Sequence, residues 1–300
     1  MYIPTKKTDP GSMRTNLAWG IFFIIIIGSC TGYAPQTIKP IPGHAHNDYE
    51  HDQPLIEALS RGYTSIEVDV HLIADTLWVI HDAPVSTQGL STIQQLYLDP
   101  LRMHIQENGG RVYPQTSDNQ AHVFTTPDLY LMVDAKTEAE STYKALLDAL
   151  KPYQDMIRVV RNGQDDTSKP VKILLSGNRP IDTILADSVQ LIGLDGRPSD
   201  LERQAPSSVM PIISQHYRRY FSWSGAGDID QEELKRFRSL VSQAKDQNKQ
   251  IRLWAAPDNE AVWSFLLDEG VGLVNTDRLE AFEKYYRNRS ESENTSYLIK

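Results

Sequence analysis

Eight short runs rich in aliphatic and β-branched residues recur along this chain, and amphipathic stretches separate several of them. Strands that alternate with helix-forming segments favour a parallel sheet, and eight such units favour a closed (β/α)8 barrel over an open doubly wound sheet. The sequence contains no glycine-rich dinucleotide fingerprint and no phosphate loop of the GxxxxGKS/T kind. The eight runs are IKPIPG, TSIEVDV, LYLMVD, VKILLSG, VQLIGLD, VMPIIS, IRLWAA and VGLVNTD.

The N-terminal segment has the pattern of an export signal. Arg14 precedes an apolar run of about 11 residues, which is shorter than the roughly 20 residues that span a bilayer. The run ends in Ile27-Gly28-Ser29-Cys30, which resembles the lipobox of bacterial lipoproteins. We therefore expect a lipid on Cys30 and a place in the bacterial cell envelope, at the periplasmic or outer surface. An ordinary cleaved signal or an uncleaved anchor remains an alternative.

The whole chain divides into four segments. We predict a signal peptide at 1–30, a tether at 31–40, a barrel domain at 41–285 and a disordered tail at 286–300. The formal net charge of -9 argues against nucleic acid as a partner, because binding to the phosphate backbone depends on clustered Lys and Arg. The single cysteine allows no intrachain disulfide.

Acidic residues occur where a parallel barrel carries its chemistry, at the C-terminal ends of strands. Glu67 and Asp69 share one face of the second run, Asp134 ends the third, and Lys136 follows two residues later. Carboxylates that face a barrel interior are costly unless a cation lies between them. The sequence predicts a site for Ca²⁺ or Mg²⁺ here. Each residue also has a structural alternative. Glu67 and Asp69 could form a salt-bridged strand end, Asp134 could cap a helix, and Lys136 could be a solvated lysine in a turn.

Histidines follow the first run and a later β-like run. The stretch GHAHNDYEHD places His44 and His46 just after the first strand, with Asn47 as a further hydrogen-bond donor. His81 lies near the end of LWVIHD, and a hairpin would return it to the same end of the barrel. Beside a metal site, these histidines are candidates for proton transfer.

The order of these motifs resembles that of the glycerophosphodiester phosphodiesterases and the wider superfamily of phosphatidylinositol-specific phospholipase C-like phosphodiesterases. The resemblance extends from about Ile41 to Leu279. It implies a phospholipase C-like phosphodiesterase barrel, a divalent cation and a pair of histidines acting as general base and general acid. By motif position, the metal ligands would be Glu67, Asp69 and Asp134, and the acid would be His81. Asp134 replaces the glutamate that is usual in the Glu-x-Lys element of that family.

The opening of the first motif departs from the family pattern. HAHNDY stands where the family has His-Arg-Gly, as in a separate branch of the superfamily. The base would be His44, with His46 as a close second. Lys136 would bind a phosphate oxygen as a point charge. Weaker candidates for substrate binding are Asn47, Asn178, Arg179 and Trp254. Arg179 would replace the missing arginine of the family pattern, unless it is a surface residue. For Trp254, packing in the core is equally expected.

The resemblance implies a metal-dependent phosphoric diester hydrolase that acts on a small phosphodiester or a lipid headgroup. One alternative is a zinc-dependent hydrolase of the amidohydrolase kind, whose first strand ends in a His-x-His pair such as His44 and His46. The other is a non-catalytic surface binding lipoprotein. In all of these interpretations the membrane contact is made only through the N-terminal lipid on Cys30.

Overall fold

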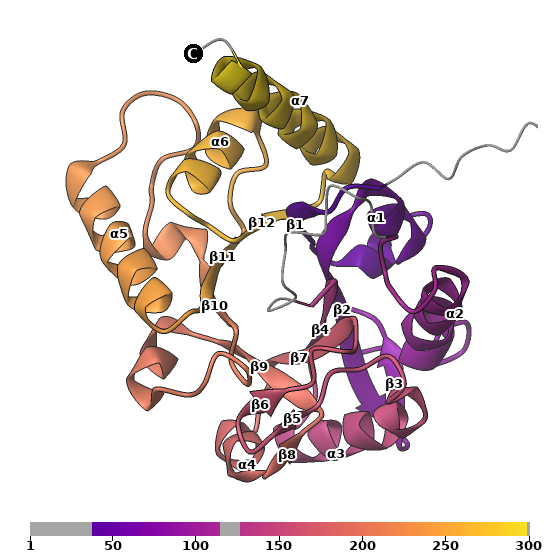
Figure 1. The fold of residues 1–300 in the computed structure, drawn as a ribbon. Coiled ribbons are helices and arrows are strands. Elements are labelled where there is room, and N and C mark those ends of the chain that lie inside the picture. The colour runs from indigo at the N-terminus through magenta and orange to yellow at the C-terminus, as the bar shows by residue number, and fades with distance from the viewer. Residues whose placement is uncertain (1–37, 115–126, 299–300) are drawn as a thin grey trace, which may run out of the picture. The chain divides into compact units, whose positions relative to one another are not determined.

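Eight parallel strands close into a barrel in the computed structural model, which describes residues 38–114 and 127–298 (Figure 1). The strands follow one another around the ring in chain order, and the first pairs with both the second and the last. Each of the eight predicted runs contributes one barrel strand, so the predicted TIM barrel is confirmed. The strands are β1 (Ile41–Ala45), β2 (Tyr63–Ile73), β4 (Leu129–Ala135), β7 (Val171–Gly177), β9 (Ile192–Gly196), β10 (Ile212–His216), β11 (Gln250–Trp254) and β12 (Leu273–Thr276).

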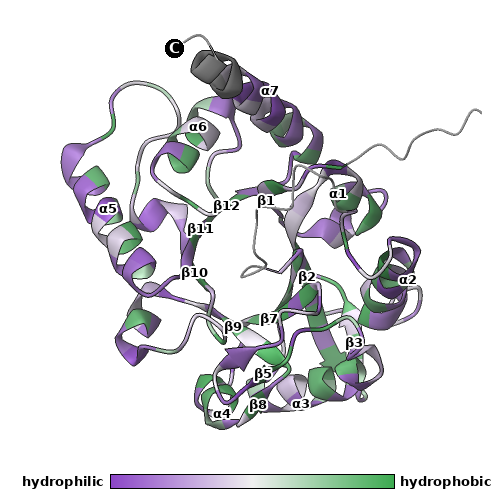
Figure 2. Ribbon diagram, in the orientation of Figure 1, coloured by the Kyte–Doolittle hydropathy of each residue, from purple (hydrophilic) through white to green (hydrophobic). Residues whose placement is uncertain are grey.

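Helices surround the ring of strands (Figure 1). Helix α5 shows how they pack, because its buried residues Phe237, Leu240 and Ala244 recur at helical spacing and form one apolar face. Hydrophilic and hydrophobic residues accordingly both occur along α5 (Figure 2). The α-helices of the described residues are α1 (Ile56–Arg61), α2 (Asp99–Glu107), α3 (Ala139–Leu150), α4 (Ile181–Ala186), α5 (Gln231–Asp246), α6 (Glu260–Asp268) and α7 (Leu279–Leu298). Shorter helical turns are η1 (Asp48–Glu50), η2 (Gln94–Leu98), η4 (Lys151–Tyr153), η5 (Pro198–Arg203) and η6 (Tyr217–Arg219).

The alternation of side chains along each strand separates two cores. On β2, Ile66 and Val68 are fully buried in the main core cluster, and the residues between them face the other side. The barrel interior holds a small apolar cluster of its own: Tyr130, Met132, Leu174, Ile212 and Leu273. Polar residues follow these positions toward the C-terminal ends of the strands, and the candidate site therefore lies at that end.

A hairpin follows the second barrel strand. Strand β3 (Thr76–Val79) pairs antiparallel with the end of β2, as the position of LWVIHD predicted. A separate three-stranded sheet consists of β6 (Gln164–Asp165), β5 (Val160–Arg161) and β8 (Val189–Gln190). The stretch MIRVVRN, which also looks like a strand, thus contributes only the two residues of β5 and lies outside the barrel.

The C-terminal segment differs from the prediction. Residues 286–300 were expected to form a disordered tail, but α7 continues through this stretch as far as Leu298. Buried Leu279 and Phe282 begin α7 and belong to the main core, so its first turns are fixed by packing. Among the described residues, no helix has the length and apolar character needed to cross a membrane. The predicted signal peptide at 1–30, with Cys30, and most of the tether lie outside the described residues.

Candidate active site

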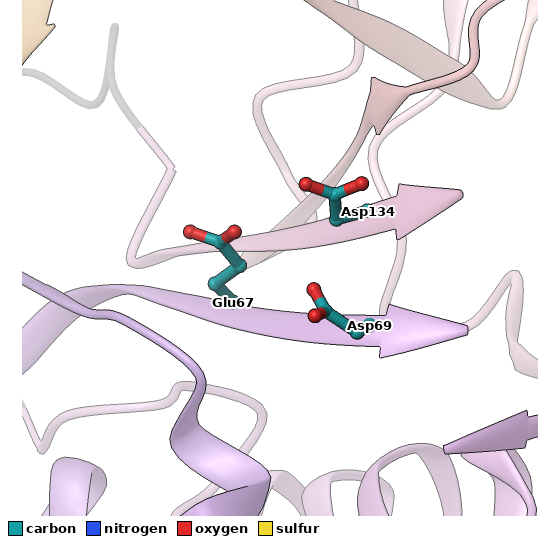
Figure 3. Close-up of side chains that lie close together, drawn as sticks. All are labelled: Glu67, Asp69 and Asp134. Atoms are coloured by element: carbon teal, nitrogen blue, oxygen red, sulfur yellow. The ribbon is translucent and has the colours of Figure 1, made fainter. Parts of the chain in front are cut away.

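Three carboxylates converge inside the barrel mouth (Figure 3). Glu67 and Asp69 occupy alternate positions on β2, and Asp69 is the register partner of Asp134 on the neighbouring β4. One oxygen from each of the three lies within 4.8 Å of the others. Asp69 is fully buried, and its Oδ1 has no hydrogen-bond partner among the described residues. A buried carboxylate oxygen without a donor, beside two further carboxylates, is the ligand set of a hard divalent cation.

Lys136 lies against this acidic cluster. Its Nζ is 3.0 Å from Asp69 Oδ2 and 3.5 Å from Asp134 Oδ2. Burial lowers the pKa of Lys136, but the two aspartates outweigh it and raise the pKa above its ordinary value. Burial, reinforced by the charge of Glu67, raises the pKa of Asp134 to about 6. The ammonium group of Lys136 therefore balances only part of the negative charge of the three carboxylates.

The hairpin brings His81 to the same aspartate. His81 Nδ1 lies 2.7 Å from Asp69 Oδ2, and the side chain is 52% exposed, so the ring stands at the edge of the mouth. Tyr49, from η1, donates to the same oxygen at 2.8 Å. The sequence did not single out Tyr49. Asp69 thus orients the His81 ring through Nδ1, and Nε2 has no hydrogen-bond partner among the described residues.

His44 lies deeper in the barrel than His46. It is fully buried, with Nδ1 2.7 Å from Ser65 Oγ and Nε2 2.6 Å from Glu67 Oε2. Burial, with the charge of Arg252, lowers the pKa of His44 to about 4. The ring is therefore neutral at physiological pH, and both of its nitrogens are occupied by protein groups.

Arg252 completes this buried network from β11. Its Nη1 donates to Glu67 Oε2 at 2.8 Å and lies 2.7 Å from His44 Nε2. Burial would raise the pKa of Glu67, but Arg252 and the hydrogen bond with His44 outweigh it and hold the pKa well below its usual range. The sequence analysis missed Arg252. Its spacing of two from Trp254 on the same strand was the available signal, because it places both on one face.

His46 lies nearer the opening. Its Nδ1 is 2.8 Å from Asp277 Oδ1, the side chain is 28% exposed, and Nε2 has no hydrogen-bond partner among the described residues. Burial lowers the pKa of His46, but the hydrogen bond to Asp277 and the charge of Glu67 outweigh it, so the pKa is raised. Asp277 thus orients His46 in the way that Asp69 orients His81.

Two of the predicted substrate-binding residues lie beyond β7 and make structural contacts. Asn178 donates to the carbonyl of Thr137 at 2.9 Å. Arg179 donates to the backbone carbonyl of Asp195 and lies 3.4 Å from a carboxylate oxygen of Asp200. No hydrogen bond joins either residue to the acidic cluster.

The remaining two candidates lie at strand ends around the mouth. Trp254 ends β11, and its ring packs edge-on against His216 of β10 with 4.3 Å between the ring centres. It is only partly buried, and therefore lines the opening beside His216. Asn47 has a left-handed backbone (φ 44°) at the start of η1, and its amide donates weakly to Glu50 at 3.5 Å.

A solved structure shares the fold of this chain. The crystal structure of a glycerophosphodiester phosphodiesterase from Parabacteroides distasonis aligns with a TM-score of 0.50 and 16% identity. The alignment covers 84% of this chain and 99% of that one. At this identity the match supports the barrel architecture.

Curated relatives come from fungi. "Altered inheritance of mitochondria protein 6 homolog" of Arthroderma benhamiae is 30% identical over 274 residues, which cover 83% of this chain and 85% of the relative. "Altered inheritance of mitochondria protein 6" of Eremothecium gossypii is 27% identical over 272 residues, which cover 81% and 68%.

These relatives overturn one part of the sequence analysis. The chain was predicted to be a lipoprotein of the bacterial cell envelope that contacts the membrane through Cys30, but the matching proteins are fungal and are named for the inheritance of mitochondria. That prediction is wrong. An apolar run followed by small residues and one cysteine is too short and too common a pattern to identify a compartment.

The family of the barrel is established by a direct match. A family model described as the AIM6-like phosphodiesterase domain matches residues 34–191. This stretch includes β1, β2 and β4, and with them the three carboxylates of the cluster. The chain belongs to the AIM6-like phosphodiesterase domain family.

Proposed function

We propose that this protein is a metal-dependent phosphodiesterase that uses His46 as general base and His81 as general acid. The main support for the proposal is that three carboxylates converge in the barrel mouth, where two partly exposed histidines also lie. Each histidine is held through Nδ1 by an aspartate, at 2.8 Å for His46 and 2.7 Å for His81. A pair of oriented histidines beside a cation site is what phosphodiester cleavage requires.

Glu67, Asp69 and Asp134 would hold the cation. Their oxygen ligands suit Ca²⁺ or Mg²⁺, and the unpartnered Oδ1 of Asp69 fits a ligand to such an ion. When bound, the ion would neutralise charge on the phosphate and make a hydroxyl or water a stronger nucleophile. Lys136 would bind a further phosphate oxygen, since its ammonium already lies at the edge of the cluster.

The role of base goes to His46 rather than to His44, which the sequence favoured. A base needs a nitrogen that can reach the nucleophile, and His46 Nε2 has no hydrogen-bond partner among the described residues. Both nitrogens of His44 contact protein groups, and the ring is fully buried. We assign His44 a positioning role, in which it fixes the carboxylate of Glu67 together with Arg252.

His81 would donate a proton to the leaving oxygen. Asp69 accepts from Nδ1 of His81, so the other ring nitrogen, Nε2, is directed away from Asp69 and would carry the proton that is donated. Proton transfer of this kind contributes about 10²–10⁴ in rate. The side chain is half exposed, which leaves room for substrates of different sizes at this edge.

The zinc-hydrolase alternative has less support. Zinc sites of that kind use several histidines, but the three-ligand group found within residues 38–114 and 127–298 contains carboxylates only. His44 is committed to Ser65 and Glu67, whereas His46 is committed to Asp277.

A single assay separates the two functions. The purified chain should hydrolyse bis(4-nitrophenyl) phosphate and a glycerophosphodiester in the presence of Ca²⁺ or Mg²⁺. Chelation should abolish the activity, and either ion should restore it. Hydrolysis of amide or ester substrates with Zn²⁺ alone, and of no phosphodiester with any ion, would overturn the proposal.

A further inference from the structure

A second polar network lies beyond β7 from the acidic cluster, and it holds Arg197, the residue that follows β9. The family pattern His-Arg-Gly is absent from this chain, and Arg179 is turned toward backbone and Asp200. We infer that Arg197 is the arginine that binds the phosphate group of the substrate. This inference rests on the proposed function of the same site.

Arg197 is held rigidly on one side. Its Nη1 donates to Asp195 Oδ2 at 2.7 Å, and to the backbone carbonyls of Asp195 and Gly196 at 3.2 and 2.9 Å. Asp195 is fully buried and also accepts from Ser176 and Ser214. Because two serines hold the buried carboxylate in place, it fixes the guanidinium plane that it binds.

The other side of the guanidinium is directed toward the acidic cluster. Nη2 donates to Ser176 Oγ at 3.2 Å, and Ser176 is the register partner of Asp134 on the adjacent β4. Strand β7, which carries Ser176, lies between β4 and β9 (Figure 1). Neighbouring strands are about 4.8 Å apart. The Arg197 guanidinium, which contacts Ser176 on β7, is therefore about one strand spacing from Asp134, a proposed metal ligand on β4.

Gly177, the residue after Ser176 on β7, leaves room for the carboxylate of Asp134. A Cβ atom at Gly177 would lie 2.1 Å from Asp134 Oδ1, so a larger residue there would displace the carboxylate. Electrostatics agree with this proximity. Burial lowers the pKa of Arg197, but Asp195 and also Asp134 outweigh it and raise the pKa.

Comparison with Arg179 and Arg252 favours Arg197. The Arg197 side chain is 27% exposed, whereas that of Arg179 is 11% exposed. Arg252 is buried and is committed to Glu67. Arg197 thus combines a fixed orientation with access to the mouth, and a guanidinium forms paired hydrogen bonds with phosphate oxygens that an ammonium cannot form.

The test is binding of inorganic phosphate to the full chain in the presence of Mg²⁺ or Ca²⁺, measured by calorimetry, together with KM for bis(4-nitrophenyl) phosphate. Arg197→Gln should weaken phosphate binding by about 10- to 100-fold. Arg197→Lys should recover part of the phosphate affinity, because lysine keeps the positive charge but lacks the paired donors of the guanidinium. Arg203→Gln is the matched control on the adjacent η5, and it should change phosphate affinity less than about twofold because Arg203 pairs with exposed Asp182.

Loss of Arg197 leaves Asp195 buried without its cation, so thermal unfolding is measured for each variant. If Arg197→Gln does not fold, the double variant Asp195→Asn with Arg197→Gln removes both charges and takes its place. Equal phosphate affinity in the folded Arg197 and Arg203 variants, or no phosphate binding by the unaltered chain, would overturn the inference. If the unaltered chain cleaves phosphodiesters and KM is unchanged in Arg197→Gln, only this inference fails. If phosphate binding depends on Arg197 but no phosphodiester is cleaved, only the proposed function fails.

Discussion

His46 and Asp277 are 231 residues apart in the sequence, yet His46 Nδ1 lies 2.8 Å from Asp277 Oδ1. The contact forms because β1 and β12 are neighbours where the barrel closes, with Ala45 paired to Thr276. The loops that follow the first and last strands therefore meet. This relationship distinguishes His46 from His44, because only one ring nitrogen of His46 contacts a protein group, whereas both nitrogens of His44 do.

Replacement of Asp277 tests this orientation. Asp277→Asn should lower kcat/KM by about tenfold, less than the 10²–10⁴ of a full proton transfer, because Asp277 is largely exposed. The variant should also lower the pKa of His46, since Asp277 raises it. A base acts when it is neutral, so the acid limb of the pH profile should move to lower pH. Glu280→Gln, an exposed carboxylate three residues on, is the control. An acid limb that does not move would exclude His46 as the base.

Removal of the cluster carboxylates tests the metal site. Glu67→Gln and Asp69→Asn should each weaken binding of Mg²⁺ or Ca²⁺ strongly. The loss should exceed the roughly 10- to 100-fold that is typical when a residue that only hydrogen-bonds to a metal ligand is replaced. Calorimetric titration with the ion gives the affinity directly. Asp148→Asn, an exposed carboxylate on α3, should leave the affinity unchanged. Wild-type affinity in both cluster variants would place the metal elsewhere.

Asp48 gives a prediction about stability. This residue of the HND motif is fully buried, and its Oδ2 accepts from the Leu55 amide at 2.6 Å and from Tyr97 at 2.9 Å. Burial raises the pKa of Asp48 to about 6, above the ordinary value of an aspartate. Folding therefore favours the protonated form. The associated stability is present below about pH 4 and is lost as pH rises through 6.

Asp48→Asn should remove this dependence. Between pH 4 and pH 7, the free energy of unfolding of the variant relative to wild type should increase by on the order of 2–3 kcal/mol. Denaturant unfolding at the two pH values measures the difference, and comparison with the wild type cancels the titration of other groups. A difference that is constant over this range would show that Asp48 remains ionised in the folded chain.

Much of the fold could be predicted because hydrophobic periodicity determines it. The eight apolar runs became the eight barrel strands, and the spacing of two along β2 correctly placed Glu67 and Asp69 on one inward face. The hairpin that returns His81 was predicted for the same reason. These features depend on residues that are close in the sequence.

The rest of the site depends on contacts between distant strands. Arg252 lies on β11, and Arg197 directly follows β9. Their positions in the sequence do not show that they belong to the site, because only the closed barrel brings them near the acidic cluster. The sequence could not show which of His44 and His46 lies deeper in the barrel. The register between β1 and β2 shifts between Ile41 and His44, so the position of a residue in the motif does not give its depth. At the N-terminus, a pattern common to many exported proteins gave the wrong compartment.

The measurement that tests the central claim most directly is the dependence of two histidine variants on the leaving group. A good leaving group such as nitrophenolate needs no proton, whereas an alkyl alcohol does. His81→Ala should therefore slow cleavage of an alkyl phosphodiester up to about 10²–10⁴ times more than cleavage of the nitrophenyl diester. His46→Ala should slow both substrates to the same degree, because both need an activated nucleophile. Equal damage by His81→Ala to the two substrates would contradict the assignment of His81 as the acid, and with it the histidine pair.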